Sequence, residues 1–162
     1  MMLINMKVIS SALLTMPSEG IEISYNSAGV LAHMVSDGEA AWKNVTVSRS
    51  TVMEKVVEAV ESWDLKTKRF INYRSFKPIL RLIPMFDSPA SQHWAVWALA
   101  NLTSTDPEKY CAYVFNEGGV PLLNQVVSDN RSTLKMKELA RVVLRNLIVW
   151  YAFCVSLLTI IL

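Results

Sequence analysis

The chain has 162 residues, of which 52% are hydrophobic and 19% are charged, and its formal net charge is +2. This composition is enough to bury a core, which excludes an intrinsically disordered chain, and the small net charge argues against a nucleic-acid-binding surface. The two cysteines, Cys111 and Cys154, have neither another cysteine nor a histidine at metal-ligand spacing, so we expect no zinc site and no cofactor.

Helical periodicity dominates the first part of the chain. Residues 1–20 predict an amphipathic helix rather than a signal peptide, because polar residues interrupt the apolar run. Residues 21–35 carry apolar side chains at steps of three and four, and a Ser-Asp-Gly sequence follows as a stop. Residues 48–65 predict another helix with either Ser48 or Ser50 as its N-cap.

The second part of the chain continues the helical pattern. Further helices are predicted over residues 73–85 with a break near Pro78, over 92–102, from Pro107 to the pair Gly118-Gly119, over 120–127, and from 134 to at least Asn146. The residues expected in the core are Leu31, Val60, Leu80, Leu82, Val96, Leu99, Leu122, Leu139 and Leu144.

Internal repetition is the most informative feature of the sequence. Pro78 and Pro121 begin similar stretches 43 residues apart, and Asn101 and Asn146 end similar stretches at an offset of 45. A weaker earlier copy places His33 at the asparagine position. These offsets lie within the period of armadillo and HEAT arrays, about 40–47 residues. We therefore predict an all-α, armadillo-like alpha solenoid of about two to three repeats over residues 1–146.

The stretch WALAN combines an aromatic side chain and an amide four residues apart, at Trp97 and Asn101. Residues at this spacing share one helix face. In an armadillo groove a Trp offers a flat wall, and an Asn amide can bond to the N–H and C=O groups of an extended peptide. His33, Trp97, Asn101 and Asn146 are thus the candidate peptide-binding groove residues.

Three of the four groove residues also have a structural alternative. Trp97 could be a core residue, as Trp94 is expected to be, and Asn101 could cap the end of its helix. His33 suits a role at the C-terminal end of its helix, where a cation is favourable, as well as it suits the groove. His93 is expected on the surface. No glycine-rich phosphate loop or nucleophile elbow is present, so we expect no enzyme and no catalytic residue.

Residues 147–162 form an apolar tail without any charge. The tail is slightly shorter than the approximately 20 apolar residues that a membrane span needs. We expect it to extend the last helix and to expose apolar surface. A membrane anchor is the alternative.

Several stretches resemble the C-terminal armadillo region of the Zyg-eleven family, mainly between residues 20 and 127. They are GIEISYNSAGVLAHMVSDGEAAW, SWDLKTKRFINYRSFKPILRLIP, SPASQHWAVWALANL and PEKYCAYVFNEGGVPLL, within which INYRSF, SQHWA and KYC are specific. The resemblance implies a substrate receptor of cullin-two RING ubiquitin ligases, which recognises proteins with an N-terminal glycine through its armadillo groove. It also implies cullin-two and elongin adaptors as partners, and a cytoplasmic location with the nucleus as the alternative.

The sequence departs from this family at both ends. The family's leucine-rich repeats, cullin-docking box and main degron-contacting helices would precede Met1, and the tail after Asn146 matches nothing in the family. We therefore expect a fragment, an isoform or a misread gene, with weak binding of glycine-first peptides by this part alone. The alternative function is a generic helical interaction scaffold that is attached to a membrane by its tail.

Overall fold

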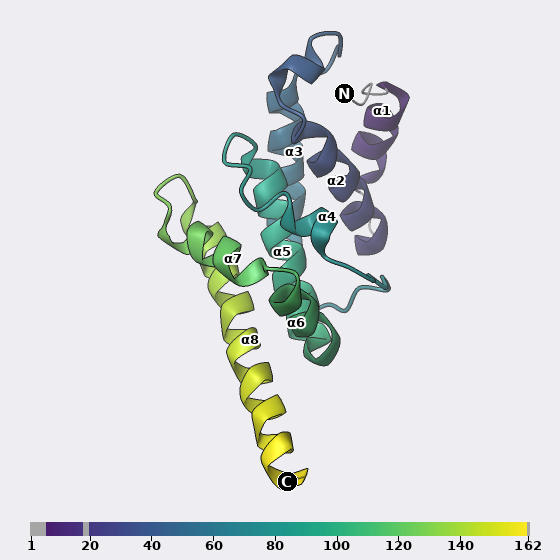
Figure 1. Cartoon of the computed structure of the whole chain (residues 1–162). Helices are drawn as coiled ribbons and strands as arrows, with labels where there is room; N and C mark the ends of the chain where they lie inside the picture. The colour runs from purple at the N-terminus through teal and green to yellow at the C-terminus, as the bar shows by residue number, and fades with distance from the viewer. Residues whose placement is uncertain (1–5, 18–19, 162) are drawn as a thin grey trace. The chain divides into compact units, whose positions relative to one another are not determined.

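The computed structural model describes residues 6–17 and 20–161, and the side chains of these residues up to 156. Within this part of the chain every regular element is helical (Figure 1). The elements are α1 (Met6–Thr15), α2 (Ile21–Val35), the short 3-10 helix η1 (Glu39–Trp42), α3 (Arg49–Ser62), α4 (Lys77–Leu80), α5 (Pro89–Thr105), α6 (Pro107–Asn116), α7 (Gly119–Ser128) and α8 (Leu134–Ile161). The first five residues of the predicted N-terminal helix lie outside the described residues.

Local sequence signals explain several helix ends. The side chain of Ser48 accepts a hydrogen bond from the backbone N–H of Thr51 at 3.1 Å, so Ser48 is the N-cap of α3. Pro107 occupies the first turn of α6, where its missing N–H leaves no hydrogen bond unmade. Gly118 separates α6 from α7 with a φ of 82°, a left-handed conformation that favours glycine.

The prediction of a helix over residues 73–85 is wrong in extent. Only Lys77–Leu80 is helical, and Pro78 lies in the first turn of this helix rather than breaking it. A carboxylate oxygen of Glu117 accepts hydrogen bonds from the Ser75 hydroxyl at 2.9 Å and from the Phe76 backbone N–H at 2.7 Å. These two hydrogen bonds give partners to the polar groups just before the start of α4.

The chain divides into two compact units. Unit 1 comprises Met1–Asp64 and Arg81–Ala95. In unit 1, α2 packs against both α1 and α3. Its core is formed by Tyr25 and Leu31 of α2 together with one face of α3, which consists of Val52, Val56 and Val60.

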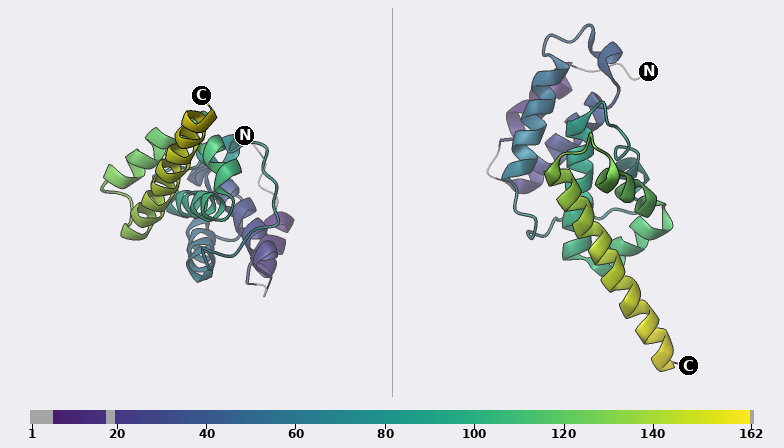
Figure 2. Two further views of the ribbon diagram at one scale, coloured as in Figure 1. Left: turned by 90° about the horizontal axis from the view of Figure 1, so that it is seen from below. Right: turned by 90° about the vertical axis from the view of Figure 1, so that its left-hand side faces the viewer.

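Unit 2 comprises Leu65–Leu80 and Val96–Leu162. Here α6, α7 and α8 pack against one another, and both views in Figure 2 show α7 beside the first half of α8. Seven of the predicted core residues are buried, but Leu122 and Leu144 are only half-buried. Leu123 and Val143 take their places in the core. In both cases the buried residue is the immediate neighbour in sequence of the predicted one.

The helix order agrees with the predicted repeats. The triplet α6–α7–α8 is consistent with one repeat, and α3, α4 and α5 form a comparable triplet in chain order. The fold is therefore all-α and consistent with an armadillo-like α-solenoid of about two to three repeats. As predicted, the helix that begins at Leu134 continues without interruption into the apolar tail (Figure 1).

Candidate peptide-binding site

Asn101 lies in α5 and is fully buried, with an exposed fraction of 0%. Its side-chain amide donates hydrogen bonds to the backbone carbonyls of Leu65 at 2.7 Å and Thr67 at 2.8 Å. Its Oδ1 atom has no hydrogen-bond partner among the described residues. The amide thus binds two carbonyls spaced two residues apart, as predicted for a peptide backbone, but the backbone belongs to the chain itself.

The segment 65–76 that Asn101 binds contains no helix and is held along its length by residues of α6. The Tyr110 hydroxyl donates to the carbonyl of Ile71 at 3.0 Å, and the Lys109 ammonium donates to the Asn72 side chain. The ring of Phe76 stacks on that of Tyr110 with the ring centroids 5.2 Å apart. We call residues 65–76 the strap.

Trp97 is also buried, with only 3% of its surface exposed. The expectation that its indole forms an open groove wall is therefore wrong, and the core alternative is the one observed. Trp97 lies in the middle of α5, within a continuous run of buried residues from 90 to 103. Neither Trp97 nor Asn101 presents a free surface to a ligand.

Asn146 is the predicted groove residue of unit 2 that remains accessible. It is half-buried in α8, and its amide donates to the Thr103 and Ser104 hydroxyls, each at 3.0 Å. Beside it lies a hollow of about 330 Å³. The hollow is lined by Thr103, Ser104, Pro107, Glu108, Asn146, Val149, Trp150 and Phe153.

The hollow is an apolar slot that also contains hydrogen-bond acceptors. Val149, Trp150 and Phe153 supply apolar walls, and the Trp150 ring also contacts Phe115 of α6 at a centroid distance of 6.1 Å. Glu108 contributes an exposed carboxylate, and Asn146 contributes its side-chain oxygen. Such a slot can hold an apolar side chain while accepting hydrogen bonds from backbone N–H groups or from a cation.

Sequence reasoning did not identify Trp150 and Glu108. Trp150 follows Asn146 by four residues, the same spacing that joins Trp97 to Asn101, and this spacing was the available signal. Glu108 had no such signal. It reaches the slot because α6 packs against α8, a tertiary contact that one sequence does not reveal.

His33 lies in unit 1, near the end of α2, and is half-buried. Its Nδ1 atom is 3.1 Å from the Nη2 atom of Arg81, and its ring contacts the edge of Trp94. Burial, and next the positive charge of Arg81, hold the pKa of His33 below its usual value. The neutral ring accepts the arginine N–H, which does not fit the alternative role as a cation at the helix end.

Trp94 and His93 complete the comparison of the α5 residues with their predicted roles. Trp94 is buried, as expected, and its indole N–H donates to the carbonyl of Tyr25 at 3.3 Å. His93 is buried too, so the prediction of a surface position is wrong. Residues 90–103 of α5 are all buried, and polar side chains among them bond to the chain, as Gln92 does to the carbonyl of Ile83 at 2.6 Å.

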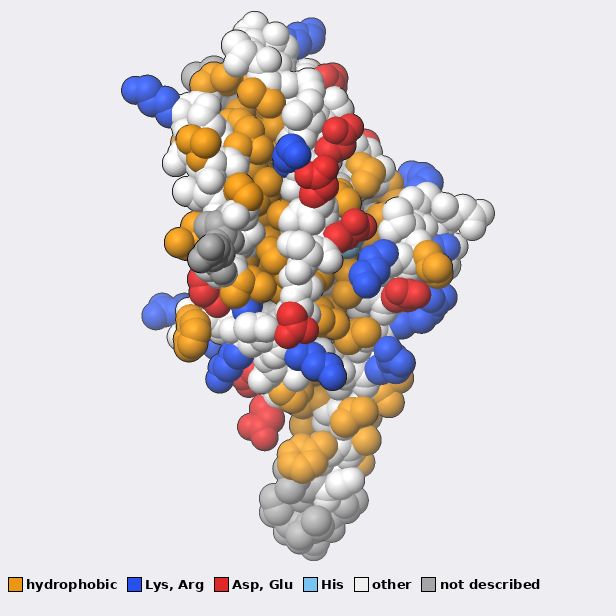
Figure 3. Space-filling view, turned by 180° about the vertical axis from the view of Figure 1, so that it is seen from behind, with side chains coloured by type: hydrophobic (Ala, Val, Ile, Leu, Met, Phe, Trp, Pro, Cys, Tyr) orange, Lys and Arg blue, Asp and Glu red, His pale blue; other side chains and the backbone are white. Residues whose placement is uncertain are grey.

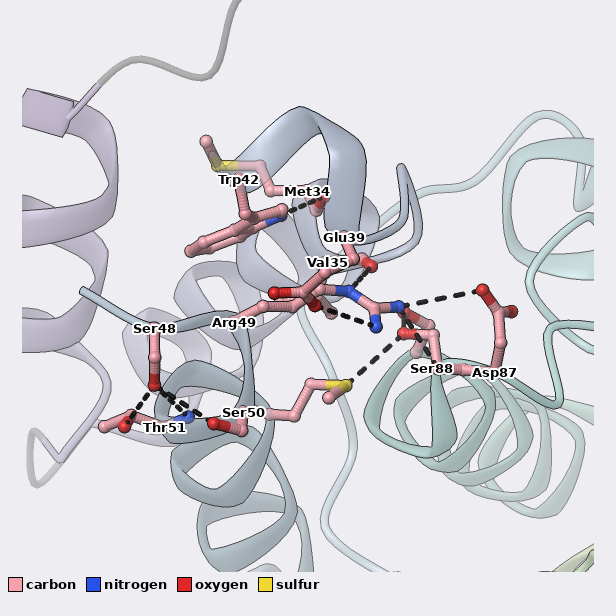
Figure 4. Close-up of polar contacts among 12 residues, drawn as sticks. Met34, Val35, Glu39, Trp42, Ser48, Arg49, Ser50, Thr51, Asp87 and Ser88 are labelled. Atoms are coloured by element: carbon pink, nitrogen blue, oxygen red, sulfur yellow. Dashed lines mark hydrogen bonds and ion pairs between the residues drawn. The ribbon is translucent and has the colours of Figure 1, made fainter. Parts of the chain in front are cut away.

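A buried arginine organises a second polar cluster in unit 1 (Figure 4). The Arg49 Nε–H donates to the carbonyl of Val35 at 2.8 Å, at the end of α2, and Nη2 donates to the carbonyl of Asp87 at 3.2 Å. The carboxylates of Glu39 and Asp87 each lie 3.9 Å from the guanidinium. Because every contact is to the chain itself, this cluster joins loops rather than forming a ligand site.

Metal binding finds no support in this geometry. Among the described residues, no three His, Cys, Asp or Glu side chains are grouped so that they could hold an ion. Cys111 is buried, and burial raises the pKa of its thiol to about 11. Near neutral pH this thiol is therefore protonated and is neither a nucleophile nor a metal ligand.

The sequence of this helical array matches a known protein family. Residues 1–148 match the family model described as "Protein zer-1 homolog-like, C-terminal domain". This match includes the strap, the Asn101 and Asn146 positions and most of unit 2, and it ends two residues into the apolar tail.

Individual relatives agree with the family match. Over 139 residues, 86% of this chain, the sequence is 65% identical to Zyg eleven-related protein 1 of Caenorhabditis elegans. It is 47% identical over 138 residues, 85% of this chain, to Protein zer-1 homolog of Homo sapiens. The similarity to Protein zer-1 homolog of Drosophila melanogaster is 50% over 125 residues, 77% of this chain. The alignments span 16%, 18% and 16% of these three relatives, respectively.

Proposed function

Because the chain belongs to the protein zer-1 homolog family, whose C-terminal domain it matches, we propose that it is the peptide-binding part of a ubiquitin-ligase substrate receptor. In this proposal the receptor works with a cullin-two RING ligase and elongin adaptors, which bind through regions outside this sequence. It recognises proteins that begin with glycine, and it catalyses no reaction itself. Its place of action is the cytoplasm, with the nucleus as the alternative.

The slot at Asn146 is the observation that supports peptide binding. It combines apolar walls with the free side-chain oxygen of Asn146 and the carboxylate of Glu108. An extended peptide offers the complementary groups, which are apolar side chains and backbone N–H donors. The strap bound to Asn101 supports the proposal further, because there an asparagine amide of this array binds two backbone carbonyls of a non-helical segment.

The role of the slot in recognising glycine-first proteins is a supporting one. The terminal ammonium is bound by helices that precede this region in the family, and the slot at Asn146 contacts the peptide farther along. This division predicts that the chain alone binds glycine-first peptides weakly or not at all. His33, Trp97 and Asn101 act in this proposal by shaping the array, since their side chains contact the chain itself.

A chimaera tests the proposal directly. Residues 1–148 of this chain replace the matching region of the Caenorhabditis elegans relative, and calorimetry measures the affinity for a glycine-first peptide. Losing one amide contact in Asn146→Ala should weaken binding by a few-fold to roughly tenfold. Asn124→Ala, a change at an exposed asparagine of α7, is the matched control and should leave binding unchanged.

Three results would count against the proposal. Equal affinity of the chimaera for the same peptide with an acetylated N-terminus would exclude recognition of the terminal ammonium. An unchanged affinity in a folded Asn146→Ala chimaera would exclude the slot. Micromolar binding by the chain alone would instead place the ammonium site within this sequence, with Glu108 as its acidic group.

A further inference from the structure

The C-terminal half of α8 presents an unusual amount of apolar surface. Five large apolar side chains are exposed there, namely Ile148, Val149, Tyr151, Phe153 and Val155. Figure 3 shows hydrophobic side chains gathered on this part of the molecule, next to the undescribed end. The helix from Leu134 to Ser156 is long and apolar enough to cross a membrane, and only 22% of its most apolar window is buried. A core helix of a soluble protein would be mostly buried.

The exposed apolar arc of α8 is wider than the apolar stripe through which one helix usually packs on another. Leu147 and Trp150 lie on the side of α8 that packs within unit 2, where Trp150 contacts Phe115 of α6. At about 100° per residue, the exposed residues from Tyr151 through Ile148 to Phe153 cover an arc of roughly 200°. A helix usually offers its partner an apolar stripe about 100° wide. A fluid hydrocarbon phase can cover the whole arc, whereas a single protein helix cannot.

The distribution of charged residues along α8 indicates where the helix would meet the surface of a lipid bilayer. Residues 147–162 contain no charge, whereas the preceding residues of the helix carry Lys135, Lys137, Glu138, Arg141 and Arg145. Arg141 and Arg145 are exposed and lie two turns and one turn before Ile148, on the same side of the helix. This sequence of basic, aromatic and apolar residues matches an anionic headgroup layer followed by hydrocarbon.

We propose that α8 docks the chain on an anionic lipid bilayer. The exposed arc from Ile148 onward enters the hydrocarbon, and Arg141 and Arg145 bind lipid phosphates, while the opposite face stays packed on α6. Val149 and Phe153 also line the slot at Asn146, so a bilayer on this arc and a peptide in the slot would compete for the same side chains.

Vesicle flotation with the purified full chain tests the proposal. We expect the chain to float with vesicles of phosphatidylcholine containing about a third phosphatidylserine. Phe153→Asp and Val149→Asp should each reduce the floated fraction at least about tenfold, because each places a charge in hydrocarbon. These side chains are 53% and 70% exposed, so neither change disturbs the core. Phe70→Asp is the matched control, since Phe70 is 90% exposed in the strap.

The basic residues have a separate readout. Arg141→Ser together with Arg145→Ser should weaken binding to the anionic vesicles by roughly thirtyfold, and should change binding to vesicles of phosphatidylcholine alone much less. Equal loss on both kinds of vesicle would overturn the role of the two arginines. Circular dichroism of every variant verifies that the helices remain folded.

Three outcomes would overturn the lipid proposal. The full chain could fail to float, or it could float equally well with Phe153→Asp and Val149→Asp, which would place the contact elsewhere. It could also form a dimer in sedimentation velocity that Phe153→Asp dissociates, without binding vesicles. That last result would assign the exposed arc to a second copy of the chain.

Discussion

At the scale of single residues, the contact between Gly29 and Trp94 is the tightest restriction in unit 1. A Cβ atom at Gly29 would lie 2.6 Å from Cζ2 of the buried Trp94 ring, whose N–H is bonded to Tyr25. We expect Gly29→Ala to lower the free energy of unfolding by about 1–2 kcal/mol in urea titrations, because overpacking exceeds the gain in helix propensity. Gly20→Ala meets no atom closer than 3.8 Å and is the control. A more stable Gly29→Ala chain would contradict this packing.

At the scale of elements, the Asn101 amide of α5 holds the start of the strap. Asn101→Ala removes the donor from two backbone carbonyls in a buried site, which typically costs about 1–3 kcal/mol. We therefore expect faster trypsin cleavage after Lys66 and Lys68, the two exposed lysines of the strap. Asn146→Ala is the matched control, since its partners are side-chain hydroxyls and not the strap. Equal cleavage rates in the two variants would show that Tyr110 of α6 and Glu117 just after it are sufficient to hold the strap.

At the scale of the whole molecule, we expect the uncharged stretch 147–162 to limit solubility, because five large apolar side chains between Ile148 and Val155 are exposed. We expect a chain that ends at Ser156 to reach a higher soluble concentration than the full chain while keeping its helical circular dichroism. Leu14→Ser, which removes one exposed apolar side chain from α1, is the control and should change solubility little. Lower solubility of the shortened chain would disprove the idea.

Local signals were sufficient for much of the helical architecture. The limits of α2, the cap at Ser48, the proline in the first turn of α6 and the left-handed glycine at its end all follow from neighbouring residues. The spacing of Asn101 and Asn146 predicted the repeat, because a repeated unit leaves a repeated pattern. These features depend on backbone chemistry within one or two turns, so the sequence alone determined them.

Tertiary packing decided which side of each helix is covered. Leu122 and Leu123 both fit the apolar face of α7, and only contact with its neighbours places Leu123 in the core. Asn101 looked like a groove residue, but the strap covers it, since a distant segment supplies the carbonyls that its amide binds. Asn146 stays accessible beside Trp150 and Glu108 because α6 and α8 leave a hollow there. Periodicity defines an apolar or polar arc, whereas burial depends on which other segment reaches that arc.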